Sequence, residues 1–146
     1  DAIVIAGMGG ETIAQILAAA PWVRARNVPL VLQPMSSLPD LREWLQKNGY
    51  TIREERLARE EDTIYVVMSV QAGEMAPLTP AELWAGRQSR DLLRGAYLEG
   101  IIHKLDRAIA GLAQAREGRG EARKQELEQV RDGLLDMKKE WDGWQR

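Results

Sequence analysis

Three glycines in four residues, Gly7, Gly9 and Gly10 with Met8 among them, follow an apolar run at the start of the sequence. Glycine lets a backbone approach a neighbour closely, and the strand-to-helix turns of parallel sheets are where α/β proteins bind ligands. The spacing begins like a dinucleotide-binding fingerprint, but Thr12 stands where the third glycine belongs. The turn therefore predicts either a ligand site or a tight turn that binds nothing.

Other common catalytic groups are scarce. His103 is the only histidine and there is no cysteine, so a histidine metal site, a thiolate site or a Ser-His-Asp triad is not expected. Ser36 and Ser37 have no base partner that the sequence identifies. Glu54 and Glu55 are expected on the solvated face of a β-hairpin. We therefore predict no metal, and the catalytic residue stays unknown.

Cationic residues recur at helical spacing in the second half of the chain. They are Arg87, Arg90, Arg94, Lys104 and Arg107. The first three are expected to share one helix face, and all five could contact the phosphates of a nucleic acid. Acidic residues are interleaved with them, at Asp91, Glu99 and Asp106. A solvated, charge-balanced face is therefore the competing interpretation.

The elements that must position the glycine turn begin with residues 1–6, an apolar run typical of a parallel strand covered on both faces. Such a strand needs neighbours, and we expect that strands preceding it have been lost. The pattern then predicts a helix, a strand, a helix and two strands, over 11–20, 30–33, 38–48, 50–57 and 64–70. The link 58–63 is too short for a parallel crossover, so the last two strands form an antiparallel hairpin. The sequence thus predicts an α/β fold: the closing half of a doubly wound sheet, with an antiparallel strand near its edge.

A change of period follows the linker 71–80. Apolar residues step by three and four over 98–112 and again over 127–144, and glycines at 118 and 120 separate the two stripes. Two heptad-like stripes joined by a glycine turn predict an antiparallel, coiled-coil-like helical hairpin. We therefore assign residues 1–76 to a partial Rossmann-like domain and 77–146 to a helical hairpin domain.

The composition restricts the class of protein. The 146 residues are 45% hydrophobic and 29% charged, with a net charge of −2, as expected for a globular chain without bulk attraction to nucleic acid. No apolar run is long enough to cross a membrane. We expect a cytoplasmic protein without a membrane partner.

Several ordered motifs resemble one family. They are Ala6–Gly10, Gln33-Pro34, Leu41–Leu45 and Asn48–Tyr50, followed by a hairpin that ends in an apolar strand. In this combination the chain resembles the bacterial tRNA (adenine-22 N1)-methyltransferase family from Asp1 to about Val70. The helical remainder agrees in kind with the helical C-terminal domain of that family.

The resemblance implies a class I methyltransferase that uses S-adenosylmethionine and modifies N1 of an adenine in tRNA. Ala6, Gly7, Met8, Gly9 and Gly10 would line the cofactor, with the glycines in the turn after the fourth strand of the complete sheet. Residues that would contact the tRNA are Gln33, Pro34, Arg90, Arg94, Lys104 and Arg107. The main cofactor loop would precede Asp1, so the fragment alone is expected to be inactive. Met35 stands where the family usually has Asn.

Two alternatives stay open at this stage. The chain could be part of another Rossmann-type enzyme that uses a nucleotide cofactor. It could also be a non-catalytic remnant that acts as a helical interaction module, since heptad stripes serve self-association as readily as an internal hairpin. Self-association through the helical hairpin or through an exposed sheet edge is a related expectation.

Overall fold

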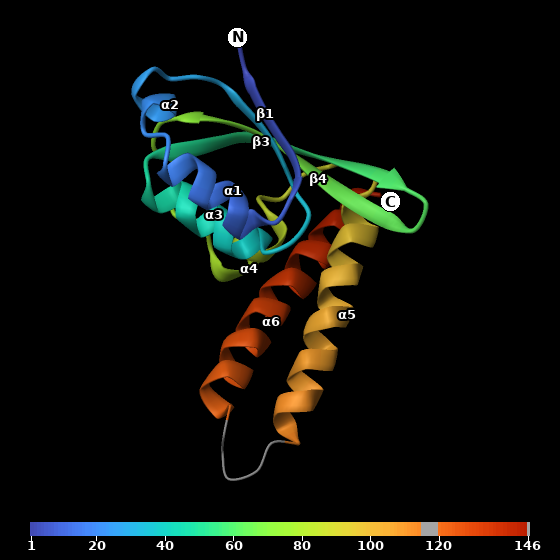
Figure 1. Cartoon of the computed structure of the whole chain (residues 1–146). Coiled ribbons are helices and arrows are strands. Elements are labelled where there is room, and N and C mark those ends of the chain that lie inside the picture. The colour runs from blue at the N-terminus through green and yellow to red at the C-terminus, as the bar shows by residue number, and fades with distance from the viewer. Residues whose placement is uncertain (115–119, 146) are drawn as a thin grey trace. The chain divides into compact units, whose positions relative to one another are not determined.

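The computed structural model describes residues 1–114 and 120–145, which form two compact units, Asp1–Leu78 and Thr79–Arg146 (Figure 1). Each unit has its own hydrophobic core. The glycine turn predicted between the long helices falls partly at Gly118 and Arg119, outside the described residues.

The first unit is built on one four-stranded sheet. Its strands are β1 (Ile3–Met8), β2 (Leu30–Pro34), β3 (Tyr50–Glu60) and β4 (Thr63–Ala72), in the spatial order β1-β2-β4-β3. β1 and β2 are parallel, whereas β4 runs antiparallel to both of its neighbours. The predicted α/β sheet with an antiparallel strand near its edge is confirmed.

One face of this sheet is covered by two helices that lie side by side, α1 (Gly10–Ala18) and α3 (Leu38–Lys47) (Figure 1). Their apolar positions recur every three or four residues and are buried: Ile13 and Leu17 on α1, Leu41 and Leu45 on α3. Burying one such side chain contributes about 1.5–3 kcal/mol. The packing of the helices on the sheet fixes where they begin: α1 follows the carboxyl end of β1, and α3 follows that of β2.

β1 differs from the prediction for residues 1–6. Ile5 is buried on the helix-covered face, but Val4, which alternates to the other face, is 67% exposed. β1 also pairs only with β2 among the described strands. Within this chain α1 and α3 cover a single face of β1, so the expected cover of the second face is not provided by the described residues.

Two local features were not predicted. The β3–β4 hairpin continues to the pair Glu60–Thr63, which reduces the expected link 58–63 to a two-residue turn with Glu61 at a φ of 55°. A four-residue helix, α2 (Trp22–Ala25), follows Pro21. Pro21 stops α1 as expected, but it also serves as the N-cap of α2, which buries Val23.

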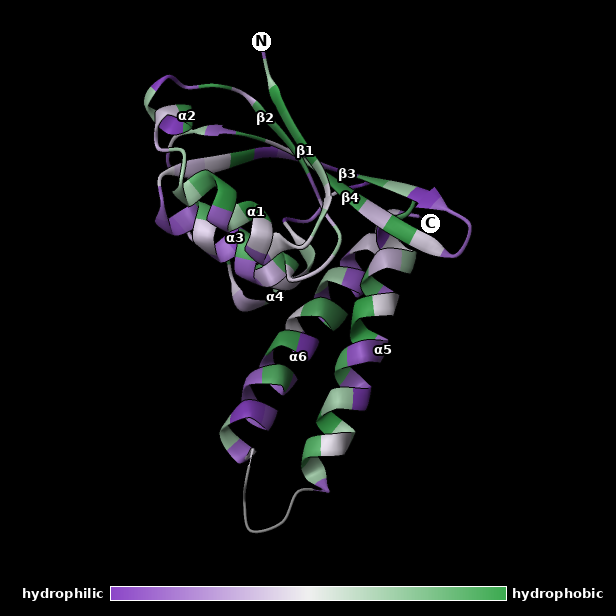
Figure 2. Ribbon diagram, in the orientation of Figure 1, coloured by the Kyte–Doolittle hydropathy of each residue, from purple (hydrophilic) through white to green (hydrophobic). Residues whose placement is uncertain are grey.

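The second unit consists of α4 (Pro80–Ala85), α5 (Arg94–Ala113) and α6 (Glu121–Trp144). α4 was not predicted; its start is fixed by a capping box between Thr79 and Glu82. Hydrophobic residues recur along α5 and α6 (Figure 2), and those that are buried include Leu98 and Leu105 on α5 and Val130 and Leu134 on α6. The two stripes therefore pack within the unit.

The two long helices are antiparallel. Glu99 pairs with Lys138 and, further along α5, Asp106 pairs with Arg131, so numbers rise on one helix as they fall on the other. The helical hairpin is confirmed, while its coiled-coil character stays a prediction. Within the described part of the chain, no helix combines the length and apolar character that a membrane span needs.

Candidate active site

Two loops meet at the carboxyl edge of the parallel strand pair. Backbone hydrogen bonds join them: the Met35 amide donates to the Met8 carbonyl at 2.8 Å, and the Gly10 amide donates to the Ser36 carbonyl at 2.7 Å. Within the strands, Ala6 lies opposite Gln33. The structure thus brings the two segments predicted to hold cofactor and base into one site.

Two of the three glycines, Gly9 and Gly10, lie at this loop-to-loop contact, where a side chain has little room. A Cβ on Gly10 would lie 2.5 Å from the Ser37 carbonyl oxygen and 2.9 Å from that of Ser36. A Cβ on Gly9 would lie 2.9 Å from the Ser36 hydroxyl oxygen. The close approach that the glycines predicted is therefore made at these two positions to the neighbouring loop.

Gly7 has a different environment. Its φ of 77° favours glycine, and no heavy atom of the described residues lies within 4 Å of a Cβ built there. The space beside Gly7 is open, at the sheet edge where parallel sheets bind ligands. Of the three glycines, this one has room for a ligand.

Gln33 and Pro34 face opposite sides of β2. Pro34 is buried together with Leu32 and Leu30, so it packs in the core and does not present its ring at the surface. Gln33 is half-buried on the other face, and its carboxamide makes no hydrogen bond within the described part of the chain. A carboxamide can both donate and accept, so Gln33 has the capacity to read a polar edge.

An ion pair holds α3, and with it the second loop, against the sheet. Arg42 is fully buried, and its Nε and Nη2 donate to Glu55 Oε2 and Oε1 at 3.0 and 2.7 Å. Glu55 was expected on the solvated face of the hairpin. A bulge between Ile52 and Glu54 shifts the alternation of β3 and turns Glu55 inward. Position 42 of the Leu41–Leu45 motif is therefore structural.

Arg94, predicted to contact tRNA, is 3% exposed. Its guanidinium donates to the carbonyls of Ala85 and Gly86 and to the side chain of Gln88. The predicted helical face of Arg87, Arg90 and Arg94 is also wrong, because the first two lie in residues 86–93, before α5 begins. We call this segment the strap.

The acidic residues interleaved with the cations are occupied by internal contacts. Glu99 and Asp106 pair with α6, at 3.3 Å to Lys138 and 3.4 Å to Arg131. Asp91 accepts a hydrogen bond from the Leu93 amide. The hydrogen bonds that Lys138 donates to Asp142 and to Glu99 raise the pKa of Lys138, while burial lowers it in part.

The two remaining predicted cations lie on α5. Lys104 and Arg107 are exposed and have no ion-pair partner among the residues that the structure describes. Because the acids around them are paired elsewhere, the outer face of α5 carries positive charge. This separation of charges was hidden in the sequence, where both signs alternate.

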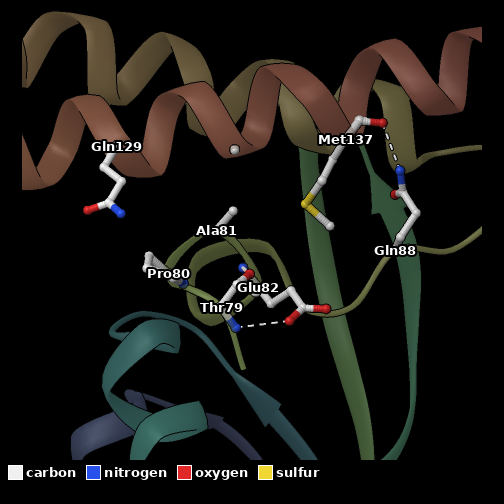
Figure 3. A pocket seen from close by; sticks show the side chains of 8 residues that line it. Thr79, Pro80, Ala81, Glu82, Gln88, Gln129 and Met137 are labelled. Carbon is white, nitrogen blue, oxygen red and sulfur yellow. Dashed lines mark hydrogen bonds between the residues drawn. The ribbon is translucent and has the colours of Figure 1, made fainter. Parts of the chain in front are cut away.

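Over residues 1–114 and 120–145, no group of three acidic, histidine or cysteine side chains could hold a metal ion. A cavity of about 440 Å³ lies beside α4 and α6, next to Gln88 and Met137 (Figure 3), and none of the predicted site residues lines it.

A parallel strand pair with a glycine turn at its carboxyl edge, together with an antiparallel hairpin, defines a Rossmann-like α/β protein. The sequence pattern described as tRNA (adenine(22)-N(1))-methyltransferase matches residues 1–139. The chain belongs to this family.

Individual relatives agree with this assignment. The tRNA (adenine(22)-N(1))-methyltransferase of Bacillus subtilis is 40% identical over 74 residues, which are 51% of this chain and 31% of that protein. The crystal structure of the B. subtilis m1A22 tRNA methyltransferase superposes with a TM-score of 0.73 at 26% identity, covering 97% of this chain and 62% of that one. A Streptococcus pneumoniae protein in complex with S-adenosyl-L-methionine gives a TM-score of 0.74 at 26% identity, covering 94% and 60%. The chain thus spans about three fifths of the solved structures and a smaller share of the curated relative.

Proposed function

We propose that this chain is part of an enzyme that transfers a methyl group from S-adenosylmethionine to N1 of an adenine in tRNA, at position 22 as in its family. The observation that carries the proposal is the open space beside Gly7, next to Gln33 at the carboxyl edge of the sheet. Family membership supplies the reaction class.

The environment of Gly7 supports the assignment of this turn to the cofactor. The open space beside Gly7 lets a ligand come close to the backbone between Ala6 and Gly10. When bound there, S-adenosylmethionine supplies an electrophilic methyl group on its sulfonium. Gly9 and Gly10 contribute indirectly, because they let the loop of residues 35–37 lie against the turn.

This reaction needs little help with proton transfer, but it needs the two reactants to be placed accurately. N1 of adenine carries a lone pair, so no strong base is needed to create the nucleophile. The enzyme must expose the Watson–Crick edge of the base and hold N1 in line with the methyl group. Gln33 is the residue we assign to the base edge, since its carboxamide has no partner within the described chain.

Met35 changes the loop less than its side chain suggests. The bond that joins the loops uses the Met35 backbone amide, which any residue except proline supplies. The Met35 side chain is 49% exposed and cannot replace the hydrogen bonds of an asparagine. We propose that loop geometry is kept and that only a side-chain contact differs.

The outer face of α5 is assigned to the phosphates of the tRNA. Lys104 and Arg107 support this, being exposed cations whose acidic neighbours are paired with α6. Arg94 is left out because its guanidinium is buried and occupied. The rival interpretation as a self-associating module has less support, because the apolar stripes of α5 and α6 are already buried within the unit.

The test uses the protein in its natural full-length form. It is incubated with S-adenosylmethionine and unmodified tRNA, and the digested RNA is analysed for N1-methyladenosine by mass spectrometry. Gln33→Ala should slow methylation by about tenfold, as expected for one lost polar contact of about 1.4 kcal/mol, whereas Gln15→Ala on the exposed surface of α1 should not.

Two results would contradict the proposal. Cofactor binding without N1-methyladenosine would reject the adenine substrate. Absence of both would reject the methyltransferase activity.

A further inference from the structure

The strap, residues 86–93, is fixed to the end of α6 by side-chain hydrogen bonds. Trp141 Nε1 donates to the Asp91 carbonyl at 2.9 Å. Gln88 Nε2 donates to the Met137 carbonyl at 2.7 Å (Figure 3). Arg94, which follows the strap, donates to the carbonyls of Ala85 and Gly86 at the end of α4. These hydrogen bonds fix the backbone of the strap, so its exposed side chains start from fixed positions.

Arg90 is one of these outward side chains, and it lies on an indole ring. Its guanidinium carbon is 4.2 Å from the centroid of the Trp144 ring. This is closer than the 5.8 Å from Arg26 to the Trp22 ring and the 6.0 Å from Arg94 to the Tyr97 ring. Arg90 is nevertheless exposed, so its plane is held from one side and accessible from the other.

Leu92, two residues further along the strap, is 81% exposed. This is the largest exposed fraction of any large hydrophobic residue that the structure describes. The strap thus carries an exposed leucine two residues after the stacked guanidinium, so it offers both an apolar side chain and a flat cationic one.

We propose that Arg90, held on Trp144, is a platform on which one unpaired nucleobase of the RNA substrate stacks, with Leu92 against the edge of that base. The identity of the RNA rests on the proposed function. Bases that have left a helical stack are commonly bound on guanidinium planes as well as on aromatic rings, and a platform that is already ordered loses less conformational entropy on binding.

Stacking and phosphate binding by Arg90 make different demands on the side chain. A phosphate contact needs the positive charge, which lysine also provides, whereas a stacked base needs the guanidinium plane. The substitution Arg90→Lys therefore separates the two roles. Arg123→Lys on α6 is its matched control, because Arg123 is an exposed arginine that pairs with Glu126 and has no assigned role in binding.

The measurement is the affinity of the full-length protein for unmodified tRNA at several salt concentrations. Arg90→Lys should weaken binding by at least about fivefold, the lower end of what one stacked base contributes, without changing the slope against salt. Trp144→Leu should cause a similar loss, and the double variant should be little worse than either one, since both remove the same platform. Arg123→Lys should bind as the wild type does.

A second variant does not depend on the ring contact. Leu92→Ser should weaken binding without altering the salt dependence, and it should fold normally because Leu92 contributes little to the core. Leu135→Ser, at a 46% exposed leucine on α6, is its control and should leave affinity unchanged.

The outcomes distinguish this proposal from the proposed function. Wild-type affinity in Arg90→Lys would overturn the platform while leaving the tRNA substrate in place. A wild-type protein that does not bind tRNA would overturn the substrate and the platform together. Equal losses in Leu92→Ser and Leu135→Ser would remove Leu92 from the contact.

Discussion

Arg42 of α3 and Glu55 of β3 form an ion pair in which two guanidinium nitrogens meet two carboxylate oxygens, with the arginine side chain fully buried and the glutamate 16% exposed. The pair connects the helix that begins at the second loop with the bulge of the hairpin. Leu41, which precedes Arg42 on α3, packs beside Gly10. The ion pair between α3 and β3 therefore supports the position of the helix that packs against the glycine turn.

Removing the Glu55 carboxylate should lower the free energy of unfolding by far more than the loss of its two hydrogen bonds alone. Glu55→Ala leaves Arg42 buried without its carboxylate, and we expect a loss of about 3 kcal/mol in the free energy of unfolding. Urea denaturation measures it. Glu43→Ala, which removes an exposed pair with Lys47, is the control and should change stability by less than about 1 kcal/mol. Equal effects would show that burial does not set the strength of the Arg42–Glu55 pair.

The glycines of the turn should respond unequally to alanine. Gly10→Ala forces a Cβ against backbone oxygens of residues 36 and 37, which cannot rotate away, so we expect about 1–3 kcal/mol of destabilisation. Gly9→Ala meets only the Ser36 hydroxyl, which can change rotamer, and should lose less. Thermal unfolding of the two variants gives the order. A larger loss in Gly9→Ala would contradict the packing described for the two loops.

Two glycines of α5, five residues apart, should give opposite results. A Cβ on Gly95 would lie 2.5 Å from the ring of Trp141, so Gly95→Ala should destabilise the protein by about 1–3 kcal/mol. Gly100 has nothing within 4 Å of its Cβ position, and Gly100→Ala should stabilise it by about 0.5–1 kcal/mol through helix propensity. Chemical denaturation measures both. Stabilisation by both substitutions would show that the indole does not pack on Gly95.

Tyr50 should delay part of the alkaline titration. Burial raises the pKa of its hydroxyl above the ordinary value of 10.0, while the charge of Arg24 lowers it in part. Because the folded-state pKa is the higher one, the stabilising contribution is complete below the unfolded pKa and is lost as the pH rises through the folded value. Ultraviolet titration of tyrosinate should show a delayed step from Tyr50. Tyr50→Phe should remove the delayed step and Tyr65→Phe should leave it.

Regular patterns in the sequence predicted most of the fold. The apolar runs of β1 and β2 and the short link of the hairpin were sufficient for the order of elements and for the antiparallel strand. The bulge after Ile52 was not predictable, since one inserted residue changes the face of Glu55 without changing composition. The helix α2 was missed because four residues are too few to show a period.

The candidate site was predictable in position and less so in the roles of its residues. The glycine turn and Gln33 lie together, as strand order requires. That Gly9 and Gly10 face a second loop depends on contacts between residues far apart in sequence. Arg94 shares its residue type and spacing with surface cations, and only tertiary structure places its guanidinium beneath the end of α4.

The strand order has a consequence for how the chain assembles as it is synthesised. β3 is made before β4, and among the described strands it pairs only with β4. It therefore cannot join the growing sheet when it first emerges, and it must wait for the following strand. The hairpin forms as a local unit, since its halves are joined by two residues, and then docks through β4 onto β2. An interruption of synthesis between the two strands would leave β3 as an unpaired extended segment, which is a hazard for aggregation.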